Sequence, residues 1–460
     1  MSLDARIGDD SIAALRATMS GEVLLPGEAG FETARRVHNG LIDRVPAVIA
    51  RCQGTPDVVD ALAFGRNHGL DIAVHGGGHN VAGRAVCDGG IVIDLSPMKG
   101  IWVDSKARRV RAQAGVCWGE FNRATQLHGL ATTGGAVSST GVAGLTLGGG
   151  FGYLMGKHGY TVDNVTSVEL VTAEGAVLTA SEDENAELFW GLRGGGGNFG
   201  IATSFEFALH PVGPTVYGGL VAFSFEDTAR SLHFLRDLAK DPYDELTAVC
   251  SLTHAPDGSG QKLAAMLVSH CGAAGRAEHA IGAVRGIAEP VIDRLGPISY
   301  CDLNRLLDPG FPKLALNYWK SCFVTSLSDE VIGILTEQFA CCPSPMSKLI
   351  VERPHGAALR RAATDTAFPL RSAGFSVLIL AQWRDASETE QNVAWARETY
   401  DLLRPHAAPA AYSNYMGDDE MLARVKQAYG ENFARLQSLK DRYDPANVFH
   451  MNQNIPPSTR

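Results

Sequence analysis

VHGGGHN, residues 74–80, begins where a short apolar run at residues 71–74 ends. Such a run is typical of a β-strand. The successive glycines Gly76, Gly77 and Gly78 let backbone amides approach an anionic group without obstruction, which favours a nest for a pyrophosphate. His79 would then stand beside a bound cofactor. A glycine turn with an incidental histidine and a His75/His79 metal pair remain alternatives, although the pair needs a helix and each glycine there costs about 1 kcal/mol.

Small residues also dominate GGAVSSTGVAGLTLGGGFGYL, residues 134–154. We expect no ordinary helix or strand here, because each interior glycine of a helix costs about 1 kcal/mol. A long segment lying against a flat ligand would explain the composition. A flexible loop is the alternative, but the interleaved Val142, Leu145, Leu147 and Leu154 favour burial.

A third glycine cluster, Gly195-x-Gly197-x-x-Gly200, formally matches the dinucleotide fingerprint. That fingerprint has to follow a strand and begin a helix. Here residues 185–192 read as a helix and residues 201–207 as a strand, so we reject a Rossmann NAD site. The backbone of this loop could still hold a nucleotide.

The fourth motif is AYSNYM, residues 411–416, in which Tyr412, Asn414 and Tyr415 are closely spaced. It could form a strand with a functional polar face. Taken alone, an ordinary surface strand is the better interpretation.

Composition limits the classes of function. The 460 residues suggest two or three domains at roughly 150 residues each. The net charge of −10 and the absence of a basic run argue against a nucleic-acid partner. The nine cysteines are scattered without a CxxC pair, so we expect neither a disulfide framework nor a metal site, and reduced thiols in the cytoplasm. Neither a signal peptide nor an apolar run of about 18 residues is visible, so we expect no membrane association.

The pattern of expected elements changes at the breaker-rich residues 210–214, the best domain boundary. Before it, short strands alternate with helices and glycine turns. After it, strands and amphipathic helices alternate, which favours an α+β fold with helices over an antiparallel sheet. The strands expected there are 218–225, 246–253, 262–269 and 375–383, and the helices are 228–237, 274–287, 388–403 and 422–443.

Together the four motifs resemble the FAD-linked oxidases of the berberine-bridge-enzyme type, within the vanillyl-alcohol-oxidase superfamily. The resemblance is carried by residues 46–213 and by the tail RYDPANVF, residues 442–449, with NQNI, residues 452–455. It is weaker in the middle, where Tyr318-Trp319-Lys320 and Ala367-Phe368 fit. It implies a two-lobed α+β fold. A PCMH-type FAD-binding domain would span residues 1–213, with its core at about 42–213, and be completed by 418–460. Residues 214–417 would form a substrate domain with an antiparallel sheet covered by helices.

The resemblance also implies FAD bound through one covalent bond, from His79 to the 8α-methyl carbon of the flavin. Many members add a cysteine bond to C6, but the matching position here is Val137, and Cys117 does not align. His75 replaces an arginine or lysine that is common at the start of the loop, which puts one phosphate contact in question. The implied cofactor-binding residues are His75, Gly76, Gly77, Gly78, His79, Asn80, Gly135, Val137, Thr140, Gly141, Gly144, Leu145, Gly149, Gly150, Gly152, Tyr153, Asn198, Gly200, Ile201, Asn452 and Asn454.

The chemistry that the resemblance implies is hydride transfer from a substrate C–H bond to flavin N5, while a base removes a proton from the adjacent O–H or N–H. In the family the base is often the first tyrosine of a Tyr-x-Asn motif. This motif gives Tyr412 as the base, Asn414 beside it and Tyr415 as the second choice. A tyrosine serves as a base only if its surroundings lower its pKa from about 10. Tyr318, Lys320 and His355 are candidates to line the substrate pocket, although each fits a structural role equally well.

Reoxidation of the flavin depends on access to the ring. Thr140 stands near the expected ring position, and its small side chain leaves room for O₂, so we expect an oxidase that releases H₂O₂. A dehydrogenase with another acceptor is the alternative. A flavoprotein that only binds or carries is disfavoured by the presence of both His79 and Tyr412. The small-molecule substrate could be an alcohol, a sugar, a secondary-metabolite hydroxyl or an amine.

Overall fold

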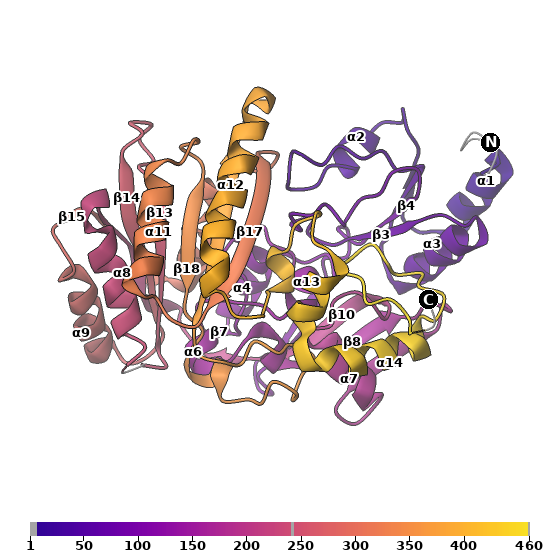
Figure 1. The fold of residues 1–460 in the computed structure, drawn as a ribbon. Coiled ribbons are helices and arrows are strands. Elements are labelled where there is room, and N and C mark those ends of the chain that lie inside the picture. The colour runs from indigo at the N-terminus through magenta and orange to yellow at the C-terminus, as the bar shows by residue number, and fades with distance from the viewer. Residues whose placement is uncertain (1–6, 241–242, 459–460) are drawn as a thin grey trace.

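The computed structural model describes residues 7–240 and 243–458, which form two lobes side by side (Figure 1). The first lobe contains the N-terminal half of the chain and the C-terminal segment. The second lobe contains the intervening residues. The predicted α+β class, with helices covering an antiparallel sheet, is confirmed.

A small sheet forms the N-terminal part of the first lobe. Its region comprises α1 (Asp9–Thr18), β1 (Glu22–Leu24), α2 (Phe31–Ala34), β2 (Val48–Arg51), α3 (Thr55–Asn67), β3 (Ile72–His75) and β4 (Ile91–Asp94). The strand order is β1-β2-β4-β3, in which β2 and β3 run parallel to β4. All four residues of β4 are buried, as its continuous apolar run requires of a covered parallel strand. The sheet thereby directs VHGGGHN from the end of β3 toward the second lobe.

A five-stranded antiparallel sheet, in the order β5-β6-β10-β8-β9, forms the rest of the first lobe. The elements of this region are β5 (Ile101–Asp104), β6 (Arg109–Gln113), α4 (Trp118–Gln126), β7 (Leu130–Ala131), α5 (Val142–Leu147), α6 (Met155–His158), η2 (Thr161–Asn164), β8 (Val165–Val171), β9 (Val177–Ser181), α7 (Ala186–Leu192), β10 (Ile201–Ala208) and β11 (His210–Pro211). The expectation that residues 134–154 contain no ordinary helix was wrong for α5. Its six residues hold only one interior glycine, Gly144, so the cost to a helix is small.

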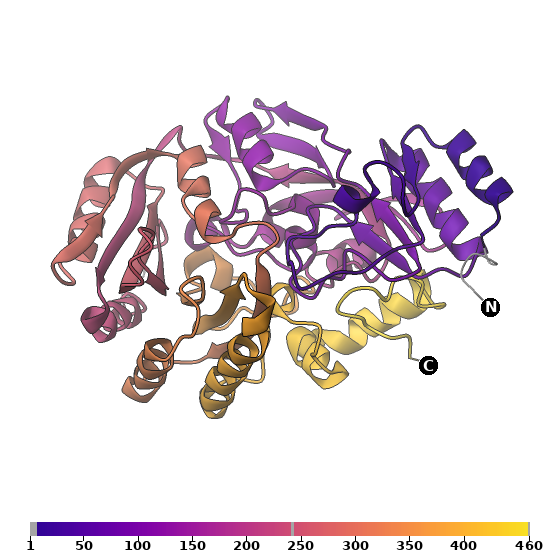
Figure 2. The ribbon, with the colours of Figure 1, turned by 90° about the horizontal axis from the view of Figure 1, so that it is seen from above.

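The second lobe is built on an eight-stranded antiparallel sheet in the order β15-β12-β14-β13-β18-β19-β17, with β16 also paired to β12. Its elements are β12 (Thr215–Ser224), α8 (Thr228–Asp237), β13 (Leu246–His254), β14 (Lys262–His270), α9 (Ala274–Arg285), β15 (Pro290–Asp293), β16 (Gly296–Ser299), α10 (Tyr300–Arg305), β17 (Leu316–Val324), α11 (Asp329–Ala340), β18 (Lys348–Glu352), β19 (Phe375–Trp383) and α12 (Thr389–Leu403). Helices α8, α9, α11 and α12 pack on one face of the sheet, on the outside of the molecule (Figure 2). The other face is turned to the first lobe.

The C-terminal segment returns to the first lobe. It consists of η8 (Ser413–Tyr415), α13 (Leu422–Tyr429), η9 (Gly430–Asn432), α14 (Phe433–Tyr443) and an extended tail. The expected strand at residues 411–416 is thus a 3₁₀ turn, and the single expected helix at 422–443 is two helices separated by Gly430, whose φ of 52° breaks the helical path. Leu436, Phe449 and Ile455 are buried in the core of the first lobe.

A buried ion pair fastens the C-terminal tail. The Lys440 ammonium donates to Asp444 at 2.7 Å, and also to the carbonyl oxygens of Asn198 and Phe449 at 2.9 Å each. The side chains of Lys440 and Asp444 are both completely buried. A buried charge is tolerated only when it is paired and hydrogen-bonded, so this set of contacts fixes the tail to the loop after α7.

Candidate active site

A cavity of about 360 Å³ lies where the two lobes meet. It is lined by residues of all three glycine clusters of the first lobe, by the inner face of the large sheet, by η8 and by the C-terminal tail. Parts of the chain that are far apart in sequence therefore form one site.

Two of these clusters, residues 74–80 and 134–154, meet backbone to backbone at the cavity wall. A Cβ atom on Gly77 would lie 2.5 Å from Cα of Gly141, and one on Gly141 would lie 2.6 Å from the Gly77 nitrogen. Real Cβ atoms do not approach so closely, so only glycine fits at either position. The loop after β3 and the start of α5 thus lie in direct contact, with Gly76, Gly78 and Gly144 also lining the cavity.

His79 lines the cavity and is held on two sides. Its Nε2 lies 2.9 Å from the Ser139 hydroxyl, and its ring stacks on that of His38 with centroids 3.9 Å apart. Burial lowers the pKa of His79 to about 3, and the nearby His38 and Lys313 contribute in the same direction. The imidazole is therefore neutral at physiological pH and carries a lone pair.

The other residues expected to bind the cofactor divide into two groups. Those that line the cavity are Gly76, Gly77, Gly78, Asn80, Gly135, Val137, Thr140, Gly141, Gly144, Leu145, Gly152, Tyr153, Gly200, Ile201 and Asn452. Those that lie behind the cavity wall are His75, Gly149, Gly150, Asn198 and Asn454.

The residues behind the wall have structural contacts instead. The Asn198 amide donates to the carbonyl oxygen of Gly195 at 2.8 Å, and its side-chain oxygen accepts from the Ile455 nitrogen at 2.9 Å. It therefore ties the third glycine cluster to the C-terminal tail. His75 is turned away from the cavity, where burial lowers its pKa, so it offers no positive charge to a phosphate there.

The candidate catalytic residues Tyr412, Asn414 and Tyr415 all line the cavity. The Tyr412 hydroxyl oxygen accepts hydrogen bonds from the Gly150 nitrogen at 3.1 Å and from the Asn414 amide at 2.9 Å. The Tyr415 hydroxyl donates to Glu352 Oε2 at 3.1 Å. Burial raises the pKa of both tyrosines, and the charge of Glu352 acts in the same direction, so both are neutral phenols near pH 7.

Glu352 is a site residue that the sequence reasoning missed. It ends β18 and lines the cavity, and burial raises the pKa of its carboxyl to about 7, although bonds from Tyr415 and Ser376 oppose this shift. Its neighbours in the cavity wall include Trp319, Phe311 and Leu378. The sequence contains a signal for this residue, because Glu352 directly follows the apolar run 349–351. A carboxyl group on a buried strand seldom lies in a core without a function.

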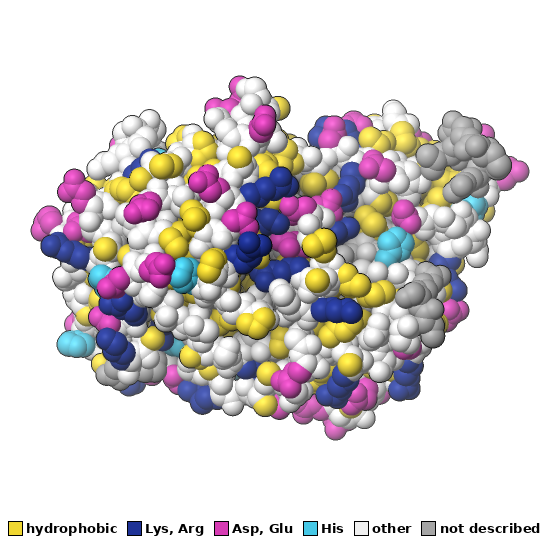
Figure 3. Space-filling model, viewed as in Figure 1, with side chains coloured by type: hydrophobic (Ala, Val, Ile, Leu, Met, Phe, Trp, Pro, Cys, Tyr) yellow, Lys and Arg dark blue, Asp and Glu magenta, His cyan; other side chains and the backbone are white. Residues whose placement is uncertain are grey.

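Tyr318 and Lys320 do not line the cavity, contrary to the expectation for them. Side chains alternate along β17, so Trp319 faces the cavity while its two neighbours face the opposite side. There Asp419 accepts from Tyr318 at 2.7 Å and from Lys320 at 2.9 Å. Figure 3 shows basic and acidic side chains gathered at the centre of the face that carries α12.

His355 also lies outside the cavity lining. Its side chain is 2% exposed, and its Nδ1 lies 3.0 Å from the carbonyl oxygen of Arg353. A Cβ atom on Gly156 would lie 2.1 Å from His355 Nε2, which places the ring against α6. The residue thus fills the contact between the lobes.

A column of stacked aromatic rings, formed by Tyr412, Phe151 and Tyr160, packs beside the cavity. Phe151 stacks on Tyr412 with centroids 4.4 Å apart and 7° between the planes, and its other face stacks on Tyr160 at 5.2 Å. The Arg371 guanidinium lies 5.0 Å from the centre of the Tyr160 ring. The column therefore leads from the cavity to a charged cluster at the contact between the lobes.

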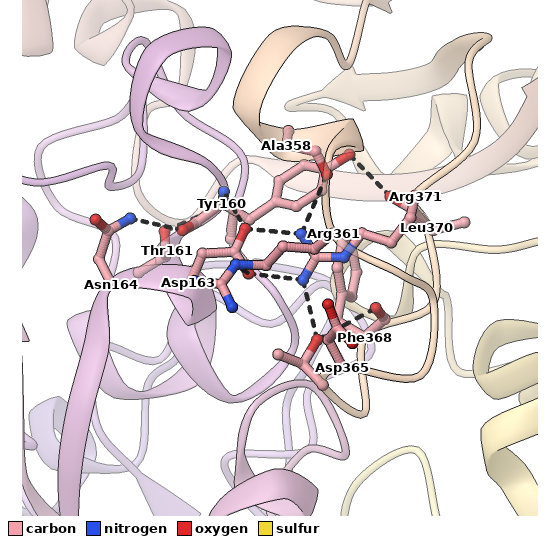
Figure 4. Close-up of polar contacts among 12 residues, drawn as sticks. Tyr160, Thr161, Asp163, Asn164, Ala358, Arg361, Asp365, Phe368, Leu370 and Arg371 are labelled. Atoms are coloured by element: carbon pink, nitrogen blue, oxygen red, sulfur yellow. Dashed lines mark hydrogen bonds and ion pairs between the residues drawn. The ribbon is translucent and has the colours of Figure 1, made fainter. Parts of the chain in front are cut away.

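That cluster is centred on Asp163 and Arg371 (Figure 4). The guanidinium donates to both carboxylate oxygens at 2.7 Å, and both side chains are only 3% exposed. Arg371 donates further to the Ala358 carbonyl oxygen and to the Thr366 hydroxyl, and the Tyr160 hydroxyl donates to the Leu370 carbonyl oxygen. Asp163 belongs to η2 of the first lobe and Arg371 to the segment before β19, so the pair joins the lobes.

The cavity fits FAD in three respects. Backbone without side chains lines one wall, as a diphosphate requires. Asn452, which also lines the cavity, has a buried side-chain oxygen without a hydrogen-bond partner among the described residues. His79 presents a neutral imidazole. Among the residues described, no group of histidine, cysteine and acidic side chains is arranged to hold a metal ion, and no helix is long and apolar enough to cross a bilayer.

Comparison with known sequences gives two family matches. The profile described as FAD binding domain matches residues 46–181, and the profile described as berberine and berberine like matches residues 411–456. The (R)-6-hydroxynicotine oxidase of Paenarthrobacter nicotinovorans is 31% identical over 458 residues, which cover 96% of this chain and 97% of the relative.

Comparison with solved structures agrees with the sequence comparison. The crystal structure of 6-hydroxy-D-nicotine oxidase from Arthrobacter nicotinovorans superposes with a TM-score of 0.87 at 30% identity, over 96% of this chain and 98% of the other. Phl p 4, a grass pollen allergen with glucose dehydrogenase activity, has a TM-score of 0.86 at 22% identity, over 97% of this chain and 99% of the other. The second likeness concerns the fold alone.

Proposed function

Because this chain belongs to the berberine-bridge-enzyme-like family of FAD-linked oxidoreductases, we propose that it is an oxidase of a compact, largely apolar small molecule bearing one amine or hydroxyl group. FAD, the cofactor of the family, supplies the hydride acceptor when bound. The residues of this chain bind the substrate, orient it and remove a proton.

The observation that carries the proposal is the carboxyl of Glu352 in an otherwise apolar and aromatic wall. A carboxyl with a pKa of about 7 is half ionised at neutral pH, which suits a general base. It also suits an amine, because an ammonium group neutralises a buried carboxylate and gains from nearby aromatic faces. The name of the relative (R)-6-hydroxynicotine oxidase agrees with an amine substrate. A sugar is less well suited, because the side chains that the large sheet places around Glu352, which include Trp319, Ile350 and Leu378, are mainly apolar or aromatic.

The tyrosines have supporting roles in this proposal. Tyr415 donates to Glu352 and so fixes the orientation of the carboxylate. Tyr412, with Gly150 and Asn414 donating to its oxygen, directs its own hydroxyl proton toward another acceptor, for which a substrate oxygen or nitrogen is suited. We therefore assign the base to Glu352 in preference to Tyr412, whose pKa burial raises.

We further propose a single covalent bond between His79 and the flavin, and dioxygen as the acceptor. The neutral imidazole at the cavity wall supports the bond, and Val137 in place of a cysteine supports the absence of a second one. The small side chain of Thr140 in the lining supports access of O₂. Both oxidases and dehydrogenases occur among proteins of this fold, so the acceptor has to be measured.

The test begins with the purified holoprotein, mixed under anaerobic conditions with a panel of amines, alcohols and sugars. Bleaching of the yellow flavin absorbance identifies a substrate, and we expect it among the amines or the apolar alcohols. Admission of air should restore the colour and release H₂O₂. Bleaching by sugars alone would overturn the proposed substrate class, and turnover only with artificial acceptors would make the enzyme a dehydrogenase.

A further inference from the structure

His38 lies directly against the proposed flavin-linking residue. Its ring stacks on His79 with 23° between the planes, and its side chain is 6% exposed. His38 Nε2 is buried and has no hydrogen-bond partner among the described residues. One face of the His79 ring is thus covered by a second imidazole that the proposed chemistry does not use.

The backbone around His38 is clamped on both sides. Its nitrogen donates to the carbonyl oxygen of Gly78, and its carbonyl oxygen accepts from the Leu314 nitrogen, at 2.9 Å each. The neighbouring Asn39 donates to the carbonyl oxygens of Val81 and Asn317 at 2.8 and 2.9 Å. The segment therefore bridges the glycine loop and the beginning of β17, and the position of the His38 ring is fixed.

A strained residue takes part in this clamp. Leu314 has a φ of 66°, which belongs to the left-handed region, and its side chain is 48% exposed. A non-glycine residue there costs of order 1–3 kcal/mol and persists only where surrounding structure enforces it. Burial of the Leu314 side chain does not explain the strain. The backbone nitrogen of Leu314 instead donates the hydrogen bond that holds the carbonyl oxygen of His38.

We propose that His38 is a positioning residue for covalent flavin attachment, since it stacks on His79, holds that ring in one orientation together with Ser139, and keeps it uncharged. The inference rests on the proposed covalent bond. In that reaction a C–H bond of the 8α-methyl group gives way to a C–N bond to His79. The methyl group and the imidazole each release a proton, and the two electrons gained by the ring system pass to dioxygen. Only an uncharged imidazole has a lone pair for this bond.

The charges that act on His79 come from two segments. Lys313, in the loop before β17, carries a positive charge that disfavours protonation of His79, and His38, in the clamped segment, adds to this effect only when it is itself protonated. Burial and Lys313 in turn lower the pKa of His38 to about 4, so the stacked partner is itself neutral above that pH. Removal of the His38 ring admits water to the covered face of His79, and its pKa should then return toward the ordinary value of about 6.5.

The experiment uses full-length protein produced in flavin-depleted cells and incubated with FAD in air between pH 5.5 and 8. Total bound flavin is measured by absorbance, and covalent flavin as the part that stays with acid-precipitated protein. In the wild type we expect the attachment rate to be constant across this range. In His38→Ala it should be about tenfold slower at pH 5.5, where about a tenth of an imidazole of ordinary pKa is neutral, and should approach the wild-type rate at pH 8.

Two further variants separate positioning from folding. His38→Phe keeps a flat ring on His79 and should attach flavin at a pH-independent rate. His38→Gln lacks the ring and should behave like His38→Ala, which keeps the test valid if the alanine variant fails to bind FAD. His128→Ala, at an exposed loop position, is the matched control and should equal the wild type.

The outcomes distinguish the two proposals. Acid-stable flavin in the wild type, together with a normal rate at pH 5.5 in His38→Ala or His38→Gln, overturns the role of His38 alone. The same holds if His38→Phe loses attachment as severely as His38→Ala at every pH. If the wild type releases all of its flavin in acid, the covalent bond itself is refuted, and this inference with it.

Discussion

Two carboxyl groups near the cavity, those of Glu352 and Asp163, have opposite surroundings. Glu352 faces the cavity and contacts Tyr415, with no cation in hydrogen-bond distance among the described residues. Asp163 lies behind the cavity and is bound at both oxygens by Arg371. The Glu352 carboxyl is therefore free to exchange a proton. The negative charge of Asp163, in contrast, is neutralised by the Arg371 guanidinium.

Replacing Glu352 should remove a titration from the reaction. If the ionised carboxylate takes the proton, kcat/KM rises as the pH passes through about 7 and is constant above it. The variant Glu352→Gln should lower kcat by about 10²–10⁴-fold and abolish this rise. The rate of flavin bleaching by a substrate from the screen, measured from pH 5 to 9, checks the prediction. Glu390→Gln, on the exposed side of α12, is the control, and an unchanged pH profile in Glu352→Gln would exclude the assigned role.

Replacing Asp163 should weaken the fold. The variant Asp163→Asn leaves the Arg371 guanidinium buried without its counter-charge, so we expect a loss of about 3–5 kcal/mol in the free energy of unfolding. Urea denaturation followed by circular dichroism gives the measurement. The exposed pair of Arg435 and Glu187 is the matched comparison, and Glu187→Gln should cost less than about 1 kcal/mol. Equal effects of the two variants would contradict the importance of the buried pair.

At the scale of elements, the contact between the loop after β3 and the start of α5 leaves no room for an added side chain. The variant Gly77→Ala forces the two backbones apart, which should cost about 1–3 kcal/mol of stability and weaken FAD binding. Equilibrium dialysis against FAD, with both proteins also carrying His79→Ala so that no covalent bond forms, tests the binding. Gly282→Ala, in α9 with nothing within 4 Å of the added Cβ atom, should instead stabilise the protein by up to about 1 kcal/mol. Undiminished FAD affinity in Gly77→Ala would show that the contact is not needed.

The sequence predicted elements well where their periodicity is strong. The bounds expected for α8 and β19 agree with the structure, because an amphipathic helix and a fully buried strand carry clear patterns. No pattern identified β17 and β18 as strands, and η8 was misread because a short polar stretch between buried elements has no period at all.

The site, like the fold, could be predicted from the sequence only where the pattern is local. Glycine composition and a known motif predicted the cavity-lining loops, since both features are local in sequence. Whether Tyr318 or Trp319 faces the cavity depends on the register of β17 with β19, which the sequence of one strand does not contain. The stack of His38 on His79 likewise depends on a contact between two distant segments.

At the scale of the whole molecule, the C-terminal tail completes the cavity, and Lys440 holds the tail in place. The variant Lys440→Ala leaves Asp444 buried without its partner and should free residues 448–458. We expect faster limited proteolysis of the tail and a lower content of non-covalent FAD in protein that also carries His79→Ala. The exposed Lys426→Ala is the control, and equal proteolysis rates in the two variants would refute the role of Lys440.

The return of the chain end to the first lobe has a consequence for biosynthesis. Residues Asn452 and Gln453 form part of the cavity wall, and they are synthesised after every other segment that lines the cavity. A nascent chain thus has no complete binding site before its C-terminal segment has been made. Loading with the vitamin-derived cofactor has to follow synthesis of this segment, and a bulky insertion directly after Ile455, which is buried, would impair loading more than one placed before α1.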